Sequence, residues 1–163
     1  MKRPLLLACL VCLASCQRAT VDENGARVVL AEHDGRLPET EGALLKLPGI
    51  GPYTAAAISS FVFGERQAVV DGNVIRVLAR IFGIDTPYDT TAGKKQITAL
   101  AQELIDENQP GAYNQAIMDF GATVCTPQAP KCPSCPLQKI CVAYKDDRIA
   151  ELPVKSKKLT IKD

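Results

Sequence analysis

Residues 47–54 read Leu-Pro-Gly-Ile-Gly-Pro-Tyr-Thr, and the interpretation of the whole chain starts from this stretch. Gly49 and Gly51 stand one residue apart, where glycine lets a backbone turn tightly with positive φ and come close to a partner. Pro52 suits the first turn of a following helix, because the amide hydrogen that proline lacks would have no helical partner there. The sequence therefore predicts a tight hairpin between two helices, at residues 41–47 and 53–63.

The start of the second predicted helix is suited to binding an anion. Its first amide groups have no partner within the helix, and the positive end of the helix dipole attracts phosphate. Downstream, Asp71 follows three apolar residues directly and precedes Gly72. We interpret the hairpin as a grip on a nucleic-acid backbone and Asp71 as a reactive carboxylate beside it. Taken alone, Gly-x-Gly is more often an ordinary turn, and an Asp before Gly is more often a turn or helix cap.

Composition sets broad limits on the protein. A chain of 163 residues suits one domain. Apolar residues make up 47% and charged residues 23%, which are ordinary globular values. The net charge of +1 does not by itself indicate nucleic-acid binding. From Cys125 onward, however, eight basic residues stand against four acidic ones, which suits either a phosphate partner or a solvated surface.

The rest of the chain is predicted to be helical. Apolar residues at helical spacing predict helices at residues 73–82, 92–107 and 113–124, with a break at Pro110-Gly111, and no segment shows sustained strand alternation. Thr40 and Thr91 are predicted to cap the helices that follow them. The helix at 53–63 is apolar almost all round, so we expect it to be buried. Arg76 and Arg80 lie four residues apart, and such a cationic stripe is usually solvated. The expected fold class is all-α.

Residues 1–26 differ from the rest of the chain. Lys2 and Arg3 precede an apolar run that ends in small residues and Cys16, which is typical of a secretory or lipoprotein signal. The run is too short to span a membrane as a mature helix. The alternative is a mis-started or frame-shifted leader that is apolar by accident. We favour this second interpretation, a leader that is apolar by accident, because the remaining motifs indicate cytoplasmic chemistry. We expect no membrane partner unless the signal is genuine.

Four cysteines lie within a proline-rich stretch of seventeen residues. Such a segment has too few apolar residues to fold alone, so a bound metal most simply stabilises it. Zinc and an iron–sulfur cluster are both satisfied by four thiolates. Only one close pair is present, which favours the cluster, whereas disulfides require that the chain is exported. The predicted ligands are Cys125, Cys132, Cys135 and Cys141.

Three features follow one another along the chain: the glycine hairpin, the Val-Asp-Gly-Asn-Val motif and the four cysteines. Together they resemble the helix-hairpin-helix DNA glycosylases that carry a [4Fe–4S] cluster, and most closely the adenine DNA glycosylases of MutY type. The resemblance implies an all-α, partial helix-hairpin-helix glycosylase domain with a C-terminal iron–sulfur cluster loop. The implied segments are a leader at 1–26, the partial domain at 27–124, the cluster loop at 125–141 and a linker or tail at 142–163.

The resemblance also implies roles for single residues. Asp71 matches the catalytic carboxylate, and the four cysteines match the cluster ligands. Tyr53 stands where the endonuclease III group has a lysine, which implies a monofunctional glycosylase in which Tyr53 supports charge near Asp71. Asn73 is expected to hold Asp71, and Gln115 to line the base pocket. The residues implied to bind DNA are Gly49, Ile50, Gly51, Tyr53 and Thr54.

The implied reaction is hydrolysis of the N-glycosidic bond of adenine mispaired with 8-oxoguanine or guanine, in base-excision repair, by a cytoplasmic monomer acting on double-stranded DNA. The base must first leave the stack, and a carboxylate then stabilises the oxocarbenium-like sugar. In this family the general acid is a glutamate upstream of the hairpin, and a C-terminal domain recognises 8-oxoguanine. We expect this chain to lack both and to be weakly active or inactive. The alternatives are a non-catalytic iron–sulfur DNA-binding module, an endonuclease III-like glycosylase, and an exported lipoprotein with a disulfide or zinc knot.

Overall fold

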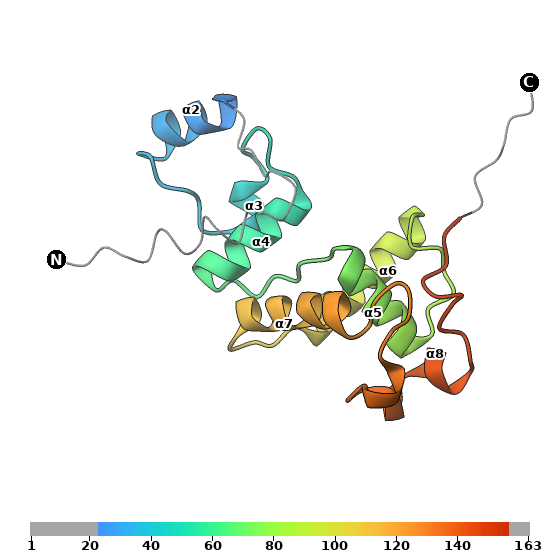
Figure 1. The fold of residues 1–163 in the computed structure, drawn as a ribbon. Helices are drawn as coiled ribbons and strands as arrows, with labels where there is room; N and C mark the ends of the chain where they lie inside the picture. The colour runs from blue at the N-terminus through green and yellow to red at the C-terminus, as the bar shows by residue number, and fades with distance from the viewer. Residues whose placement is uncertain (1–22, 157–163) are drawn as a thin grey trace, which may run out of the picture.

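The computed structural model describes residues 23–156, which form helices joined by loops, with no strand among them (Figure 1). The predicted all-α class is confirmed. Most of the predicted leader lies outside the described residues, as does 157–163. None of the described helices is long and apolar enough to cross a bilayer. The helices are α2 (Glu23–Glu32), α3 (Glu41–Leu44), α4 (Pro52–Phe63), α5 (Gly72–Phe82), α6 (Thr91–Leu104), α7 (Pro110–Thr123) and α8 (Val142–Lys145), with short 3₁₀ helices η1 (Cys132–Ser134) and η2 (Gln138–Ile140).

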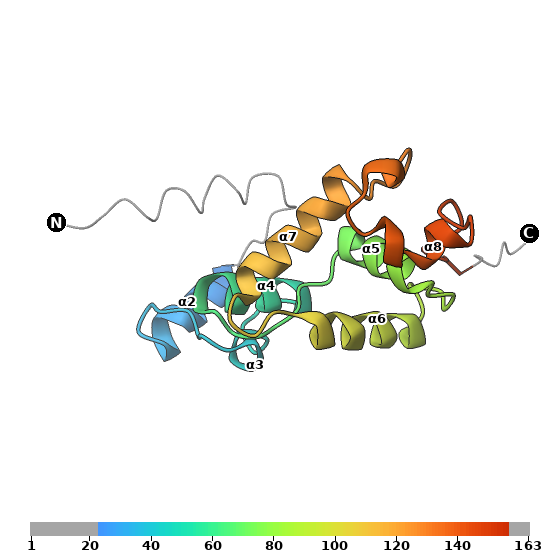
Figure 2. The same ribbon diagram turned by 90° about the horizontal axis from the view of Figure 1, so that it is seen from below.

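Helix α5 is the centre of the larger part of the molecule. It packs against α6, α7 and α8, and Figure 2 shows it between α6 and α7. Leu78 of α5 and Ile97 of α6 are buried in the apolar cluster of this part. A second cluster joins α2, α3 and α4 through Val29 and Leu44. Helix α7 also packs against α4, so it connects the hairpin to α5.

Several helices begin or end at residues other than the predicted ones, because of local hydrogen bonds and proline. Thr40 caps α3 as expected, but α3 ends at Leu44 rather than at residue 47. Thr90, not Thr91, caps α6, where its hydroxyl accepts from the amide of Gly93 at 3.1 Å. Pro110 does not lie in a break before α7 but occupies its first turn. Proline is compatible with that position because no helical hydrogen bond is lost there.

Helix α4 is only partly buried, contrary to the expectation from its apolar composition. Ala55 and Ala56 are buried where α4 meets its neighbours. Phe61, Val62 and Phe63 remain 42%, 59% and 36% exposed. Among the described elements, α4 packs mainly against α3 and α7, which leaves its other face uncovered. An apolar patch of this kind on a helix favours association with another surface.

The part of the predicted linker or tail from residue 142 to residue 156 packs against the rest of the fold. Its first residues form α8, and Leu152 is 2% exposed. The amide of Tyr88 donates to the carbonyl of Val154 at 3.0 Å. The carboxylate of Asp89 accepts from the amide and hydroxyl of Ser156, at 2.8 and 2.6 Å, and these bonds lower the pKa of Asp89. The segment therefore closes over the loop between α5 and α6.

The close approach of Gly93 to this loop predicts a strong effect of adding one methyl group. A Cβ at Gly93 would lie 2.0 Å from the carbonyl oxygen of Pro87. We expect Gly93→Ala to lower the free energy of unfolding by about 2–3 kcal/mol, because rigid backbone must move. Gly42→Ala is the control, since a Cβ there meets nothing within 4 Å and alanine favours a helix. Chemical denaturation of both variants measures this; equal stabilities would contradict the packing described here.

Candidate functional site

The hairpin joins α3 to α4 through one turn of positive φ. Gly49 has φ +79°, in the left-handed region that favours glycine. Gly51, at φ −91°, is extended and serves as the N-cap of α4, so the prediction of positive φ is wrong there. Ile50 is buried with Leu44 in the cluster beneath the turn. The Ile50 side chain therefore supports the turn by packing, and Ile50 can contact DNA only through its backbone.

The beginning of α4 is open to a partner. Gly51 makes no side-chain cap hydrogen bond, and a Cβ there would meet no atom within 4 Å. Pro52 occupies the first turn, as predicted. Tyr53 is 37% exposed, and Thr54 is half-buried. This surface has the donors and the dipole direction that an anion requires.

Asp71 is held at the other end of the candidate site by two hydrogen bonds. It is the N-cap of α5, where Oδ1 accepts from the amide of Val74 at 2.8 Å. Oδ2 accepts from the side-chain amide of Asn73, also at 2.8 Å. Asp71 is thus a helix cap and stays half-exposed. Two carboxylate oxygens offer about four acceptor positions, so capping leaves acceptor capacity for another group.

Two amide side chains from distant helices position the extended segment that leads to Asp71. Asn114 of α7 is buried; its Oδ1 accepts from the amide of Val69 at 3.0 Å, and its Nδ2 donates to the carbonyl of Gln67 at 2.9 Å. Gln102 of α6 accepts from the amide of Ala68 at 2.9 Å. These bonds replace the strand partner that the segment lacks. Sequence reasoning missed both roles, because nothing local distinguishes these amides from surface residues.

Arg76 and Arg80 are buried, so the prediction of a solvated cationic stripe is wrong. Arg76 is 8% exposed, and its guanidinium donates to Asn73 Oδ1 at 2.8 Å and to the carbonyls of Gly121 and Cys125, each at 2.7 Å. Burial lowers its pKa, yet an arginine remains charged. The same side chain thus contacts the residue that holds Asp71 and the first cysteine of the quartet.

The four cysteines line one small hollow with apolar walls. Nη1 of Arg80 donates to Sγ of Cys125 at 3.5 Å, and Sγ of Cys141 donates to the carbonyl of Arg80 at 3.4 Å. Burial raises the pKa of the Cys132 thiol, and the other three thiols raise it further. The structure therefore gathers Cys125, Cys132, Cys135 and Cys141 at one place.

This donor set consists of thiols alone. Within residues 23–156, no group of three or more His, Cys, Asp or Glu side chains is arranged to hold a metal ion. All four thiols nevertheless line the hollow, and Cys132 lies close enough to the other three for them to raise its pKa. By donor type, the set suits a thiolate-ligated iron–sulfur cluster, which is larger than a single ion.

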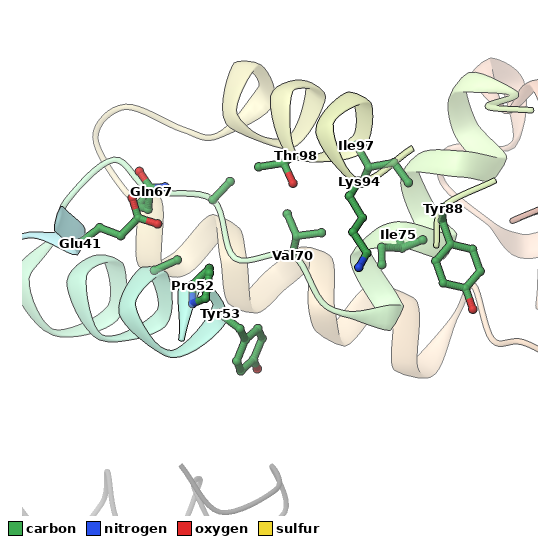
Figure 3. Close-up of a pocket in the computed structure, with 12 residues that line it drawn as sticks. Glu41, Pro52, Tyr53, Gln67, Val70, Ile75, Tyr88, Lys94, Ile97 and Thr98 are labelled. Carbon is green, nitrogen blue, oxygen red and sulfur yellow. The ribbon is translucent and has the colours of Figure 1, made fainter. Parts of the chain in front are cut away.

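A cavity of about 330 Å³ lies between the hairpin and α6 (Figure 3). Tyr53 lines it together with Tyr88 and Lys94. Glu41 lines its far end beside Gln67; burial raises the pKa of Glu41, and the nearby Glu65 carboxylate raises it further. No spacing in the sequence indicated this cavity, because its residues meet only in the folded chain.

Gln115 does not join this group. It is exposed on α7, where its amide donates to the carboxylate of Asp119 at 2.9 Å, and it does not line the cavity beside Tyr53. Asp71 itself does not line that cavity either, although its neighbours Val70 and Ile75 do. The structure thus brings Tyr53 near the Asp71 segment and leaves Gln115 on a separate face.

Comparison with known proteins identifies the fold and its relatives. Residues 32–61 match the family model "Helix-hairpin-helix motif". The human adenine DNA glycosylase is 48% identical over 122 residues, which are 74% of this chain and 22% of that protein. The structure superposes on a thermostable thymine-DNA glycosylase with a TM-score of 0.69, at 37% identity, covering 76% of this chain and 56% of the other. The chain therefore carries a helix-hairpin-helix motif and is similar over most of its length to DNA glycosylases.

The chain is also similar to a thymine/uracil-DNA glycosylase and to endonuclease III. The thymine/uracil-DNA glycosylase of Methanothermobacter thermautotrophicus is 38% identical over 80% of this chain and 58% of its own length. Endonuclease III in a non-covalent DNA complex superposes with a TM-score of 0.61, at 28% identity, over 74% of this chain and 55% of that one. This chain spans about a quarter or less of the adenine glycosylases of human and mouse.

The buried fork of Arg76 predicts that lysine cannot replace it. Lysine keeps the charge but cannot donate at once to Asn73, Gly121 and Cys125 in a planar arrangement. We expect Arg76→Lys to lower the free energy of unfolding by about 2–3 kcal/mol, the cost of buried acceptors without donors. Arg66→Lys is the matched control, because Arg66 makes an exposed ion pair of 3.8 Å with Glu107. Denaturant titration of both variants tests this, and a stable Arg76→Lys protein would contradict it.

Proposed function

We propose that this chain acts as an adenine DNA glycosylase of base-excision repair, cleaving the N-glycosidic bond of adenine opposite 8-oxoguanine or guanine. Its similarity to the adenine DNA glycosylases of human and mouse supports the substrate. The observation that carries the proposal is the fixed carboxylate of Asp71, held by Asn73 and by the amide of Val74 at the start of α5. Tyr53, at the start of α4, lines the same cavity as Val70, the residue that precedes Asp71.

In the proposed reaction, the hairpin binds DNA phosphates and Asp71 acts on the sugar. The open start of α4 supplies donors for a phosphate, which holds the strand in register. A base flipped out of the duplex exposes its glycosidic bond, and breaking that bond leaves positive charge on the sugar. A carboxylate already fixed by hydrogen bonds stabilises that charge without reorganising. We propose that Tyr53 supports this charge from the hairpin.

Three acids before the hairpin turn are candidates for the general acid, and Glu41, whose pKa is raised by burial, lies at the far end of the cavity beside Gln67. Glu23 and Glu32 of α2 are both exposed, and Glu23 pairs with Arg27 at 2.5 Å. A general acid must lie within hydrogen-bond reach of the leaving base, and we propose that none of these three carboxyl groups does. We therefore propose slow release of adenine, with binding retained better than turnover.

We further propose that the cysteine hollow holds a [4Fe–4S] cluster. Four thiolates are the usual ligand set of such a cluster, and the residues present are of that kind. When bound, the cluster would crosslink the loop from residue 125 to residue 141. Arg80 would donate to the sulfur of Cys125, a contact of the sort that orients a ligand.

Removal of a thymine or uracil base is the second candidate reaction. The thymine/uracil-DNA glycosylase of Methanothermobacter is matched over a larger share of its length than the adenine enzymes are. Strand nicking of the endonuclease III type is disfavoured, because Tyr53 provides no amine at the hairpin position. Comparing duplexes that carry adenine opposite 8-oxoguanine with duplexes that carry thymine or uracil opposite guanine separates the two reactions.

Asp71→Asn tests the catalytic role without loss of the helix cap. Asparagine caps helices as well as aspartate does, so the fold should survive, while the charge that stabilises the sugar is lost. In a single-turnover assay with excess protein on duplex with adenine opposite 8-oxoguanine, we expect release at least about 100-fold slower than in the parent chain, the usual size of such an electrostatic loss. DNA affinity should change by less than about threefold, because no phosphate contact is removed.

Asp147→Asn is the control for that experiment. Asp147 is exposed and has φ +54°, a conformation that asparagine tolerates well. The Asp147→Asn variant should release adenine at the same rate as the parent chain. If Asp71→Asn releases adenine as fast as the control variant, Asp71 is only a helix cap and the proposed mechanism is wrong.

The cluster proposal predicts iron in protein prepared without oxygen. We expect about four iron atoms per chain with visible absorbance, and a much lower iron content after Cys132→Ser, which removes one ligand. Ser134→Ala is the matched control, because Ser134 lies between two of the four cysteines but has no thiol. The iron content of this variant should be unchanged. Metal analysis by mass spectrometry measures both. Zinc in place of iron, or iron unaffected by Cys132→Ser, would contradict the proposal.

A further inference from the structure

The cavity between the hairpin and α6 carries a side chain that the proposed reaction does not use. Lys94, in the first turns of α6, lines the cavity together with Val70 and Ile75, the residues on either side of the Asp71 turn. Figure 3 shows its amine reaching from α6 toward the space between these two residues. The chain thus places a cation next to the segment that carries the candidate catalytic carboxylate.

Among residues 23–156, no carboxylate forms an ion pair with Lys94. Of the described residues that line the cavity, Lys94 is the one with a positive charge, and the acid, Glu41, lies at the far end beside Gln67. Lys94 is an exposed side chain, and its amine, at a cavity wall without a carboxylate partner among these residues, favours an anion as its partner.

The walls of the cavity indicate which kind of anion fits. Tyr53 and Tyr88 contribute aromatic rings, and Pro52, at the open start of α4, forms another part of the wall. Aromatic and apolar side chains beside a cation suit a nucleotide, whose phosphate meets the charge while its sugar or base contacts the rings. A volume of about 330 Å³ has the size range of small-ligand sites.

We propose that Lys94 binds a phosphodiester of the DNA strand held by the hairpin and thereby seats the target nucleotide beside Asp71. The inference rests on the proposed function, because it takes DNA as the ligand. It adds a second phosphate contact, from α6, to the one at the start of α4. The strand is then held on both sides of the Asp71 segment, which fixes the sugar relative to the carboxylate.

Lys95 provides a matched control on the same helix. It is exposed like Lys94, but it does not line the cavity. Lys94→Gln and Lys95→Gln change the net charge equally, so a general electrostatic effect would be the same in both. Only a direct phosphate contact distinguishes them.

The test is fluorescence anisotropy with a duplex that carries a tetrahydrofuran abasic-site analogue, at several salt concentrations. We expect Lys94→Gln to weaken binding about fivefold to tenfold and to reduce the slope of log affinity against log salt by about 0.9, the loss of one phosphate contact. Lys95→Gln should stay within about twofold of the parent chain, and Lys94→Arg should restore binding and slope.

The outcomes separate this inference from the proposed function. If the parent chain binds the duplex but Lys94→Gln and Lys95→Gln behave alike, the role of Lys94 is wrong while the proposed function stands. If the parent chain does not bind the duplex, both fail. A weaker Lys94→Gln protein that Lys94→Arg does not rescue would also contradict the phosphate contact.

Discussion

The structure depends on two guanidinium groups buried along α5. A charge taken out of water must be hydrogen-bonded, or the fold pays several kcal/mol for it. Arg76 meets this demand with the carbonyls of Gly121 and Cys125, and Arg80 with those of Thr126 and Leu152. The end of α7, the cysteine loop and the C-terminal segment are therefore all bound to one helix.

The same helix begins with Asp71, and this links the two halves of the candidate site. Asn73 contacts Asp71 on one side and Arg76 on the other. The backbone of α7 comes so close that a Cβ at Gly121 would lie 2.6 Å from Cβ of Asn73. Asn114, also on α7, holds the extended segment before Asp71. The carboxylate is thus held by local hydrogen bonds from Asn73 and Val74, and tertiary contacts fix the groups around it, as a preorganised electrostatic site requires.

Features set by neighbouring residues were predictable from the sequence. Pro52 in the first turn of α4, Thr40 as a helix cap and the positive φ of Gly49 all follow from local backbone chemistry. The cysteine spacing and the Asp-Gly-Asn motif indicate the similarity to DNA glycosylases from the sequence alone. Asn73 is predicted from the motif to hold Asp71, and its side-chain amide donates a hydrogen bond to the Asp71 carboxylate.

What failed depended on contacts between distant segments. A cation at helical spacing looks the same in sequence whether water or carbonyl groups surround it, so Arg80 was placed on the surface. The polar composition around Leu152 concealed one buried side chain that holds the C-terminal segment in place. The cavity was not foreseen either, because Glu41, Tyr53 and Lys94 come from three different elements.

The most direct measurement of the central claim is a crystal structure of the chain bound to duplex DNA with an abasic-site analogue. The claim is that the hairpin and Asp71 act on the same nucleotide. We predict a phosphate at the start of α4 and the analogue's sugar in contact with the Asp71 carboxylate. A duplex bound elsewhere, for example along the lysine-rich C-terminal end and away from Asp71, would contradict the account.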